Sequence, residues 1–150
     1  MFLLDTNILS AVMGTRPAPE VANWMTQQPA ELLFTAAVCQ AEILSGIAVL
    51  PKGPHGSSPW AEGPRREALE MAALSMFRED FAGRILSFDT DAAVIYAELF
   101  ASRRSAGRAT AIADLMIASI ARAHGAGVVT RDTGDFVDCG LALINPWASS

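Results

Sequence analysis

Short apolar runs alternate along the chain with longer stretches in which apolar positions recur every three or four residues. The runs suit buried strands, whereas the recurring positions are typical of amphipathic helices. The predicted strands cover residues 2–5, 32–35, 84–88, 128–130 and 141–144. The predicted helices cover residues 6–13, 19–28, 37–50, 65–81, 91–105 and 111–123. Because strands and helices alternate, we expect an α/β fold whose mostly parallel sheet of four to five strands is covered on both faces.

The segment 51–64, PKGPHGSSPWAEGP, is the clearest interruption of this pattern. Its four prolines and three glycines exclude regular secondary structure. Neither flank is long enough to fold alone, so we expect an exposed loop inside a single domain that covers residues 1–150. A chain of 150 residues is large enough to bury a hydrophobic core of its own.

The apolar runs and the N-terminal sequence indicate in which compartment of the cell the protein is found. No apolar run approaches the roughly 20 residues of a membrane span. The N-terminus also lacks the basic region of a signal peptide, and Asp5 interrupts the only early apolar stretch. We therefore expect a cytoplasmic protein that has no contact with a membrane, in which Cys39 and Cys139 are reduced and buried.

The charged residues limit which ligands the protein can bind and which reactions it can catalyse. The net charge of −5 argues against a general nucleic-acid-binding surface, but ten of the eleven basic residues are arginines and leave room for a local one. The single lysine, Lys52, lies in the proline-rich loop. The chain therefore has no lysine that could serve in reactions requiring one inside the active site.

Four acidic residues fall at one edge of the predicted sheet, although they are far apart in the sequence. Asp5 ends the first strand and Asp132 follows the fourth, so both lie at the carboxyl edge, where ligands bind in such sheets. Glu42 lies early in the helix that leaves the second strand. Asp114 lies in the first turn of the helix that runs down to the fourth strand. Each crossover helix begins at the carboxyl edge, so these two carboxylates are expected there as well.

Four carboxylates at one edge repel one another and raise their own pKa values. A divalent cation removes this conflict, and hard oxygen ligands suit Mg²⁺ or Mn²⁺. A metal-bound water can attack phosphorus while the metal stabilises charge on a phosphoryl oxygen. The sequence therefore predicts a site for one or two cations, of the kind typical of phosphodiester hydrolysis.

Each of these residues also has a simpler interpretation. Asp5 can cap the helix that follows it, and Glu42 can be a surface residue of an amphipathic helix. An aspartate in a first helical turn, such as Asp114, favours the helix dipole whatever it binds. Asp132 and Asp135 can be turn residues, and Asp135 beside Gly134 looks like one. The shared edge of the sheet is what favours a functional role for the four.

At these residues the chain resembles the PIN-domain ribonucleases, in particular the VapC/FitB-type toxins of bacterial toxin–antitoxin pairs. The similar segments occur in order over nearly the whole chain. They are FLLDTNILS at 2–10, AEILSGI at 41–47, IADLMIASIARAHG at 112–125, VVTRDTGDF at 128–136 and INPW at 144–147. Each segment is weak evidence alone, and together they are specific.

The resemblance implies a three-layer α/β/α sandwich and cleavage of RNA with Mg²⁺ or Mn²⁺. It also implies a homodimer, inhibition by a cognate antitoxin, and DNA binding only through the complex with that antitoxin. The family's acidic tetrad, catalytic and metal-binding, maps onto Asp5, Glu42, Asp114 and Asp132. Thr6 and Thr130 are implied as hydroxyl neighbours of the tetrad, and Asp135 as an accessory metal-binding carboxylate.

Two features beside the tetrad stay open. The 51–64 loop looks longer than usual for the family and lies where such toxins meet the antitoxin, so it either adjusts partner choice or is a tolerated insertion. Arg103, Arg104 and Arg108 precede the Asp114 helix, and they either contact RNA phosphates or form a solvated helix end. The acidic pocket can also receive an arginine of the antitoxin.

Two other functions compete with the nuclease. A phosphatase of the haloacid-dehalogenase type uses an aspartate such as Asp5 as a nucleophile, but it needs a second aspartate where this chain has Asn7, and a core lysine. A non-catalytic component of a toxin–antitoxin complex, acting in repression, is the alternative from another class. Cleavage of single-stranded RNA in Mg²⁺ or Mn²⁺, stopped by EDTA, separates the nuclease from both.

Overall fold

The computed structural model describes residues 1–50 and 63–148. Its five strands form a parallel sheet in the order β3-β2-β1-β4-β5. They are β1 (Phe2–Leu4), β2 (Leu33–Ala36), β3 (Ile85–Leu86), β4 (Gly127–Val129) and β5 (Leu143–Ile144). Because β1 lies in the middle of the sheet, the chain that leaves it at Asp5 emerges at the centre of the carboxyl edge.

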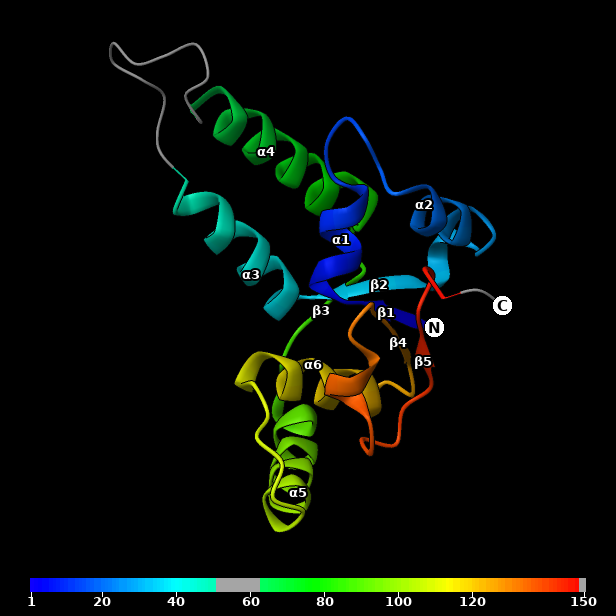
Figure 1. Cartoon of the computed structure of the whole chain (residues 1–150), viewed down its shortest axis with the longest axis vertical. Helices are drawn as coiled ribbons and strands as arrows, with labels where there is room; N and C mark the ends of the chain where they lie inside the picture. The colour runs from blue at the N-terminus through cyan, green and yellow to red at the C-terminus, as the bar shows by residue number, and fades with distance from the viewer. Residues whose placement is uncertain (51–62, 149–150) are drawn as a thin grey trace.

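Helices cover the sheet on both faces, as Figure 1 shows, with α1 to α4 on one side of the strands and α5 and α6 on the other. Their bounds are α1 (Thr6–Val12), α2 (Pro19–Thr26), α3 (Ala37–Ala48), α4 (Gly63–Ser75), α5 (Thr90–Ser105) and α6 (Ile112–Ala123). Short 3₁₀ turns cover Ala30–Leu32 and Thr133–Phe136. The expected α/β fold is confirmed in its strands, its parallel pairing and its three layers. Within the described ranges, no helix is both long and apolar enough to cross a membrane.

The core lies where the apolar runs were predicted to be strands. Leu3 and Leu4 of β1 and Val128 and Val129 of β4 are fully buried, because both faces of the central strands pack against helices. At about 25 cal/mol per Å² of buried apolar surface, such side chains supply much of the free energy of folding. A carboxylate placed directly after β1 is therefore held by the best-packed part of the protein.

Helix ends follow their sequence signals. The carboxylate of Asp89 caps α5 by accepting a 2.9 Å hydrogen bond from the amide of Ala92. Gly125 ends α6 with a φ of +66°, a conformation that residues with a side chain rarely adopt. This turn brings the chain back to the start of β4 and so sets where Asp132 will lie. Cys39 and Cys139 are buried and unpaired, as expected.

The helix predicted over 65–81 differs from the structure. α4 already begins at Gly63 and ends at Ser75, and a π-helical turn follows over Met76–Asp80. Proline is tolerated in a first helical turn, so Pro64 does not delay the start. The wider π turn keeps Met76 and Phe77 buried in the core. The predicted 51–64 loop otherwise lies outside the described residues.

Of the five strands, β1, β3 and β5 are shorter than predicted, and β2 and β4 are each shifted by one residue. Leu32 belongs to a 3₁₀ turn, and β3 keeps only Ile85–Leu86 of the predicted 84–88. β3 is an edge strand, so only one neighbour, β2, supplies ladder hydrogen bonds to it. Apolar runs predict the presence of a strand better than its length, because hydrogen-bonded partners decide where the ladder stops.

Candidate active site

Asp5 links the first and fourth strands at the carboxyl edge. Its amide donates a 3.0 Å hydrogen bond to the carbonyl oxygen of Val129, which extends the pairing of β1 with β4. Asp5 is 5% exposed, and its carboxylate accepts hydrogen bonds from the Thr6 amide at 2.8 Å, the Thr130 hydroxyl at 2.7 Å and the Asn7 side-chain amide at 3.4 Å. Asp5 thus caps α1, as its simpler interpretation held, and it also faces the residues that follow β4.

Asn7 brings Asp132 to the same place. Its side-chain amide donates hydrogen bonds to Oδ2 of Asp132 at 3.1 Å and to the hydroxyl of Thr130 at 3.2 Å. Its side-chain carbonyl accepts a 3.1 Å bond from the amide of Arg131. From the sequence alone, Asn7 counts only against a phosphatase of the haloacid-dehalogenase type. Its place two residues after Asp5, next to the end of a predicted strand, was the only sequence signal of this bridging role.

Glu42 joins from α3. The hydroxyl of Thr6 donates a 2.7 Å hydrogen bond to Oε1 of Glu42, so the residue that follows Asp5 holds the carboxylate of another helix. The two threonines implied as hydroxyl neighbours therefore do contact the acidic residues. Glu42 is exposed, and its carboxylate is open to solvent and to a ligand.

Asp114 and Asp135 complete the cluster through their charges. Burial first, and then the negative charges of four other acidic residues, raise the pKa of Asp114 from 3.8 to about 6. The four are Asp5, Asp135, Glu42 and Asp132. Burial also raises the pKa of Asp5 against the hydrogen bonds from Thr130 and Thr6. The acidic residues expected at one edge therefore lie within electrostatic reach of one another.

The cluster suits a hydrated magnesium or manganese ion better than a closed cage of protein ligands. Among the described residues, no three histidine, cysteine, aspartate or glutamate side chains are close enough together to hold a metal ion between them. Mg²⁺ binds through one or two carboxylates and keeps several waters, so wider spacing of the acidic groups is compatible with it. A cation would also relieve the repulsion that raises the pKa of Asp114.

The thiol nearest this edge is inert. Burial, together with the charge of Asp5, raises the pKa of Cys39 to about 12. A thiol that stays protonated is neither a nucleophile nor a metal ligand at neutral pH. The chemistry of the site therefore belongs to its oxygen groups.

Arg103 is a buried residue that binds the segments next to the acidic cluster. It is 7% exposed, and its guanidinium donates to the carbonyl oxygens of Asp135 at 3.0 Å and Val137 at 2.7 Å. It also donates to Sγ of Cys139 at 3.0 Å and to the hydroxyl of Thr110 at 3.2 Å. Arg103 thereby ties the turn that carries Asp135 to the segment before Asp114.

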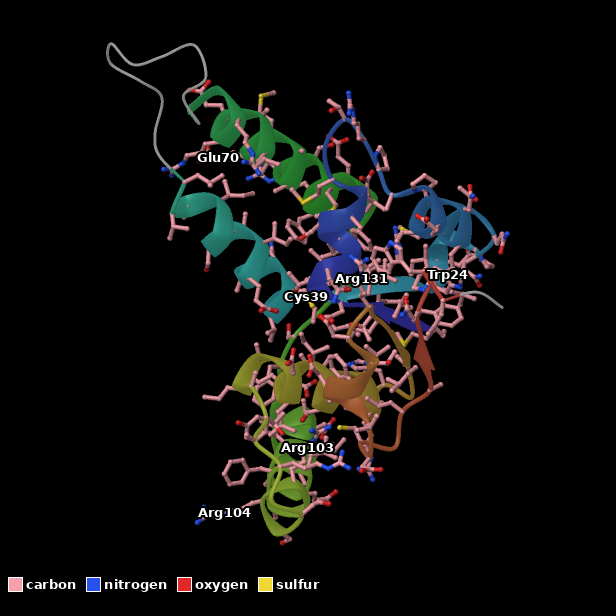
Figure 2. All side chains as sticks on the ribbon, viewed as in Figure 1. Trp24, Cys39, Glu70, Arg103, Arg104 and Arg131 are labelled. Atoms are coloured by element: carbon pink, nitrogen blue, oxygen red, sulfur yellow. The ribbon has the colours of Figure 1, made fainter. Side chains whose placement is uncertain are left out.

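Arg103 is not part of a solvated helix end, because its side chain is buried and its guanidinium is bound to backbone carbonyl oxygens. Arg104, the next residue, points away from the fold at the outer end of α5 (Figure 2). A signal for the difference was present, because Arg103 shares the buried face of α5 with Ala92 and Leu99 at helical spacing. For this residue, the position on the buried face of the helix predicts burial better than the charge of the side chain predicts exposure.

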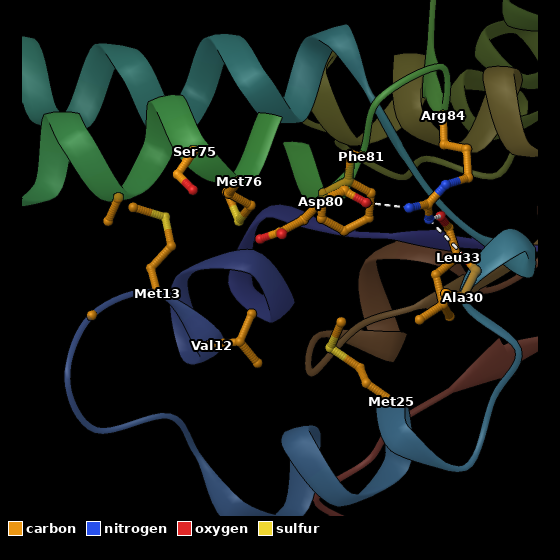
Figure 3. A pocket seen from close by; sticks show the side chains of 12 residues that line it. Val12, Met13, Met25, Ala30, Leu33, Ser75, Met76, Asp80, Phe81 and Arg84 are labelled. Carbon is orange, nitrogen blue, oxygen red and sulfur yellow. Dashed lines mark hydrogen bonds between the residues drawn. The ribbon is translucent and has the colours of Figure 1, made fainter. Parts of the chain in front are cut away.

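A separate groove of about 600 Å³ lies between α1, α2 and the π-helical turn (Figure 3). Its walls are largely apolar and include Met13, Met25 and Met76, and Arg84 closes one end by donating to backbone carbonyl oxygens of Asp80 and Leu33. None of the acidic residues described above lines it. The groove is therefore a different surface from the candidate active site.

The family model of the PIN domain matches residues 2–139. The chain belongs to the PIN domain family. This confirms the resemblance found in the sequence motifs. The plasmid stability protein StbB of Pseudomonas syringae pv. tomato is 44% identical over 98% of this chain and 99% of its own length. The VapC ribonuclease Y4jK of Sinorhizobium fredii is 37% identical over 98% of each chain.

Solved structures agree with the fold of this PIN protein. The chain superposes with a TM-score of 0.85 on a structure described as FitAB bound to an IR36 DNA fragment. The two are 33% identical, and the match covers 100% of this chain and 98% of the other. The three-layer arrangement with a parallel sheet is therefore the PIN fold.

Proposed function

We propose that this protein is a metal-dependent endoribonuclease that acts as the toxin of a bacterial toxin–antitoxin pair. The observation that supports this most is the gathering of carboxylates at the carboxyl edge of the sheet. Thr130 and Asn7 join Asp5 to Asp132, and Thr6 joins the same strand end to Glu42. The membership of the PIN family and the relative named VapC ribonuclease point the same way.

Asp5, Glu42, Asp114 and Asp132 are the proposed catalytic and metal-binding residues, with Asp135 as an accessory carboxylate. When bound, Mg²⁺ or Mn²⁺ supplies an activated water and stabilises charge on the phosphoryl oxygen. The protein's part is to hold the carboxylates in fixed positions. Asp5 is held by the Thr6 amide and the Thr130 hydroxyl, and Glu42 by the Thr6 hydroxyl.

Partners follow from the same proposal. The substrate is RNA, the protein forms a homodimer in the cytoplasm, and a cognate antitoxin inhibits it. The apolar groove beside Met13 and Met25 offers surface for a protein partner. We also expect DNA binding only in the complex with the antitoxin, and the solved structure described as FitAB bound to an IR36 DNA fragment is an example of DNA binding by a related complex.

The competing functions have less support. A phosphatase of the haloacid-dehalogenase type needs an acid at position 7, whereas Asn7 donates a hydrogen bond to Asp132. A non-catalytic repressor component has no need for carboxylates whose charges raise the pKa of Asp114. Such a costly arrangement favours a role in cation binding.

The test is cleavage of labelled single-stranded RNA by the purified protein in Mg²⁺ or Mn²⁺, with EDTA as the negative control. The matched variant is Asp5→Asn, because its side-chain oxygen still accepts from the Thr6 amide and preserves the cap of α1. We expect a loss of activity greater than about 100-fold, with a melting temperature no lower than that of the wild-type protein, because burial raises the pKa of Asp5 and the neutral amide avoids that cost. Full activity of Asp5→Asn, or cleavage that continues in EDTA, would overturn the proposal.

A further inference from the structure

Besides the apolar groove, the protein has a cavity of about 520 Å³ with charged walls. It opens beside the acidic edge, between the segment before α6 and the turn after β4. Asp114 and Asp135 form one part of its lining. Arg103, Arg108 and Thr110 form another part. Carboxylates proposed to hold a cation therefore share a cavity with cationic and hydroxyl groups that suit an anion.

Arg108 is the accessible cation of this cavity. Its side chain is 44% exposed, and its guanidinium forms a 3.0 Å ion pair with Asp138, whose side chain is 73% exposed. Exposed ion pairs contribute little net free energy, so another anion can replace the Asp138 carboxylate at low cost. Arg108 is thus held near the cavity by a weak partner and remains able to bind a ligand.

Thr110 adds a directed donor. Its oxygen accepts a 3.2 Å hydrogen bond from the Arg103 guanidinium, which leaves the hydroxyl proton for an acceptor in the cavity. Arg103 itself is buried and fixed by backbone carbonyl oxygens, so it contributes a positive charge that does not move. An anionic oxygen in the cavity would meet the Thr110 hydroxyl and the Arg108 guanidinium together.

We propose that Arg108 and Thr110 form a subsite for a backbone phosphate of RNA that adjoins the phosphate cut at the acidic edge. This inference rests on the proposed nuclease function. A strand of RNA that lies across the acidic edge carries a negative charge at every nucleotide, and the net charge of the protein, −5, opposes its approach. The Arg108 guanidinium lies beside the carboxylates and attracts the flanking phosphate. Without it, the negative charges of the carboxylates would repel that phosphate.

The test measures binding of a fluorescent single-stranded RNA in Mg²⁺ across a series of salt concentrations, in an Asp5→Asn background that does not cut. Arg108→Met is expected to weaken binding about tenfold. It should also make the slope of log K against log salt shallower by about 0.7, the value for one phosphate contact on a single strand. Arg108→Lys should keep most of the salt slope. Arg78→Met, which removes an exposed arginine of the π-helical turn, is the matched control and should change neither quantity.

Asp138→Asn separates phosphate binding from a purely structural ion pair. Asp138 has a φ of +61°, which asparagine also tolerates, so this variant removes the competing carboxylate without straining the backbone. The subsite predicts that Asp138→Asn binds RNA as tightly as the parent or more tightly, whereas Arg108→Met binds more weakly. Equal weakening by both variants would show that Arg108 only fixes the loop and would overturn the inference.

The remaining outcomes distinguish the inference from the function on which it rests. If the wild-type protein cuts RNA but Arg108→Met binds and cuts RNA normally with an unchanged salt slope, the subsite is wrong and the nuclease stands. If Arg108→Met instead loses only its affinity for the antitoxin, the cavity is a protein-docking site and the inference is again wrong. If the wild-type protein neither cuts nor saturably binds RNA, both proposals fall.

Discussion

The hydroxyl of Thr6 donates a 2.7 Å hydrogen bond to Oε1 of Glu42, although 36 residues separate the two in the chain. Thr6 is the first residue of α1, and Glu42 lies on α3. Glu42 is otherwise exposed, so this bond selects one position for a carboxylate that solvent would leave free. A threonine beside Asp5 therefore places a second acidic residue of the cluster.

The first prediction concerns this bond. Thr6→Val removes the donor while keeping the shape of the side chain, so Glu42 becomes mobile and the carboxylates lose their fixed spacing. We expect the concentration of Mn²⁺ required for half-maximal RNA cleavage to rise about 10- to 100-fold, as for other residues that orient metal ligands. Thr6→Ser retains the hydroxyl and should behave like the wild-type protein. Equal metal dependence of Thr6→Val and wild type would contradict a positioning role.

The second prediction concerns pH. Burial and then the charges of neighbouring carboxylates raise the pKa of Asp114 from 3.8 to about 6. The folded protein therefore keeps this proton to higher pH than the unfolded chain does, and the contribution of Asp114 to stability is lost as pH rises from about 4 through about 6. In EDTA, Asp114→Asn should resist urea better than wild type at neutral pH and no better at pH 4. Mg²⁺ should reduce the difference in stability between the variant and the wild-type protein at neutral pH. A difference in stability that does not change with pH would contradict this account.

The third prediction compares two adjacent arginines. Arg103→Met leaves the carbonyl oxygens of Asp135 and Val137 without their donor, and we expect unfolding to become easier by about 2–4 kcal/mol. Arg104→Met changes an exposed residue of the same helix and should alter stability by less than about 0.5 kcal/mol. Urea unfolding of both variants measures the difference. Equal stability of the two would mean that the buried guanidinium contributes nothing.

The acidic edge was predictable because chain direction determines it. Asp5 directly follows one apolar run and Asp132 lies three residues after the end of another, and in a parallel sheet the ends of such runs meet at one edge. The helix direction that such a sheet requires then places Asp114. These inferences use only local patterns and a rule of topology, so they needed no knowledge of which side chains touch.

Features that depend on tertiary contacts were not predictable in the same way. The burial of Arg103 depends on carbonyl oxygens more than 30 residues away, at Asp135 and Val137. The bridge from Asn7 to Asp132 spans 125 residues. The π-helical turn at Met76–Asp80 and the short β3 likewise reflect what packs or pairs beside them. Periodicity identifies which face of an element is apolar, and it does not identify the polar partner of a buried group.

The most direct test of the central claim is a titration of the metal-free protein with Mn²⁺, followed by electron paramagnetic resonance of the free ion. The account predicts saturable binding that Mg²⁺ displaces and that Asp5→Asn weakens by at least about tenfold while the fold is preserved. Absence of saturable binding, or equal binding by wild type and Asp5→Asn, would contradict the claim that these carboxylates form a cation site.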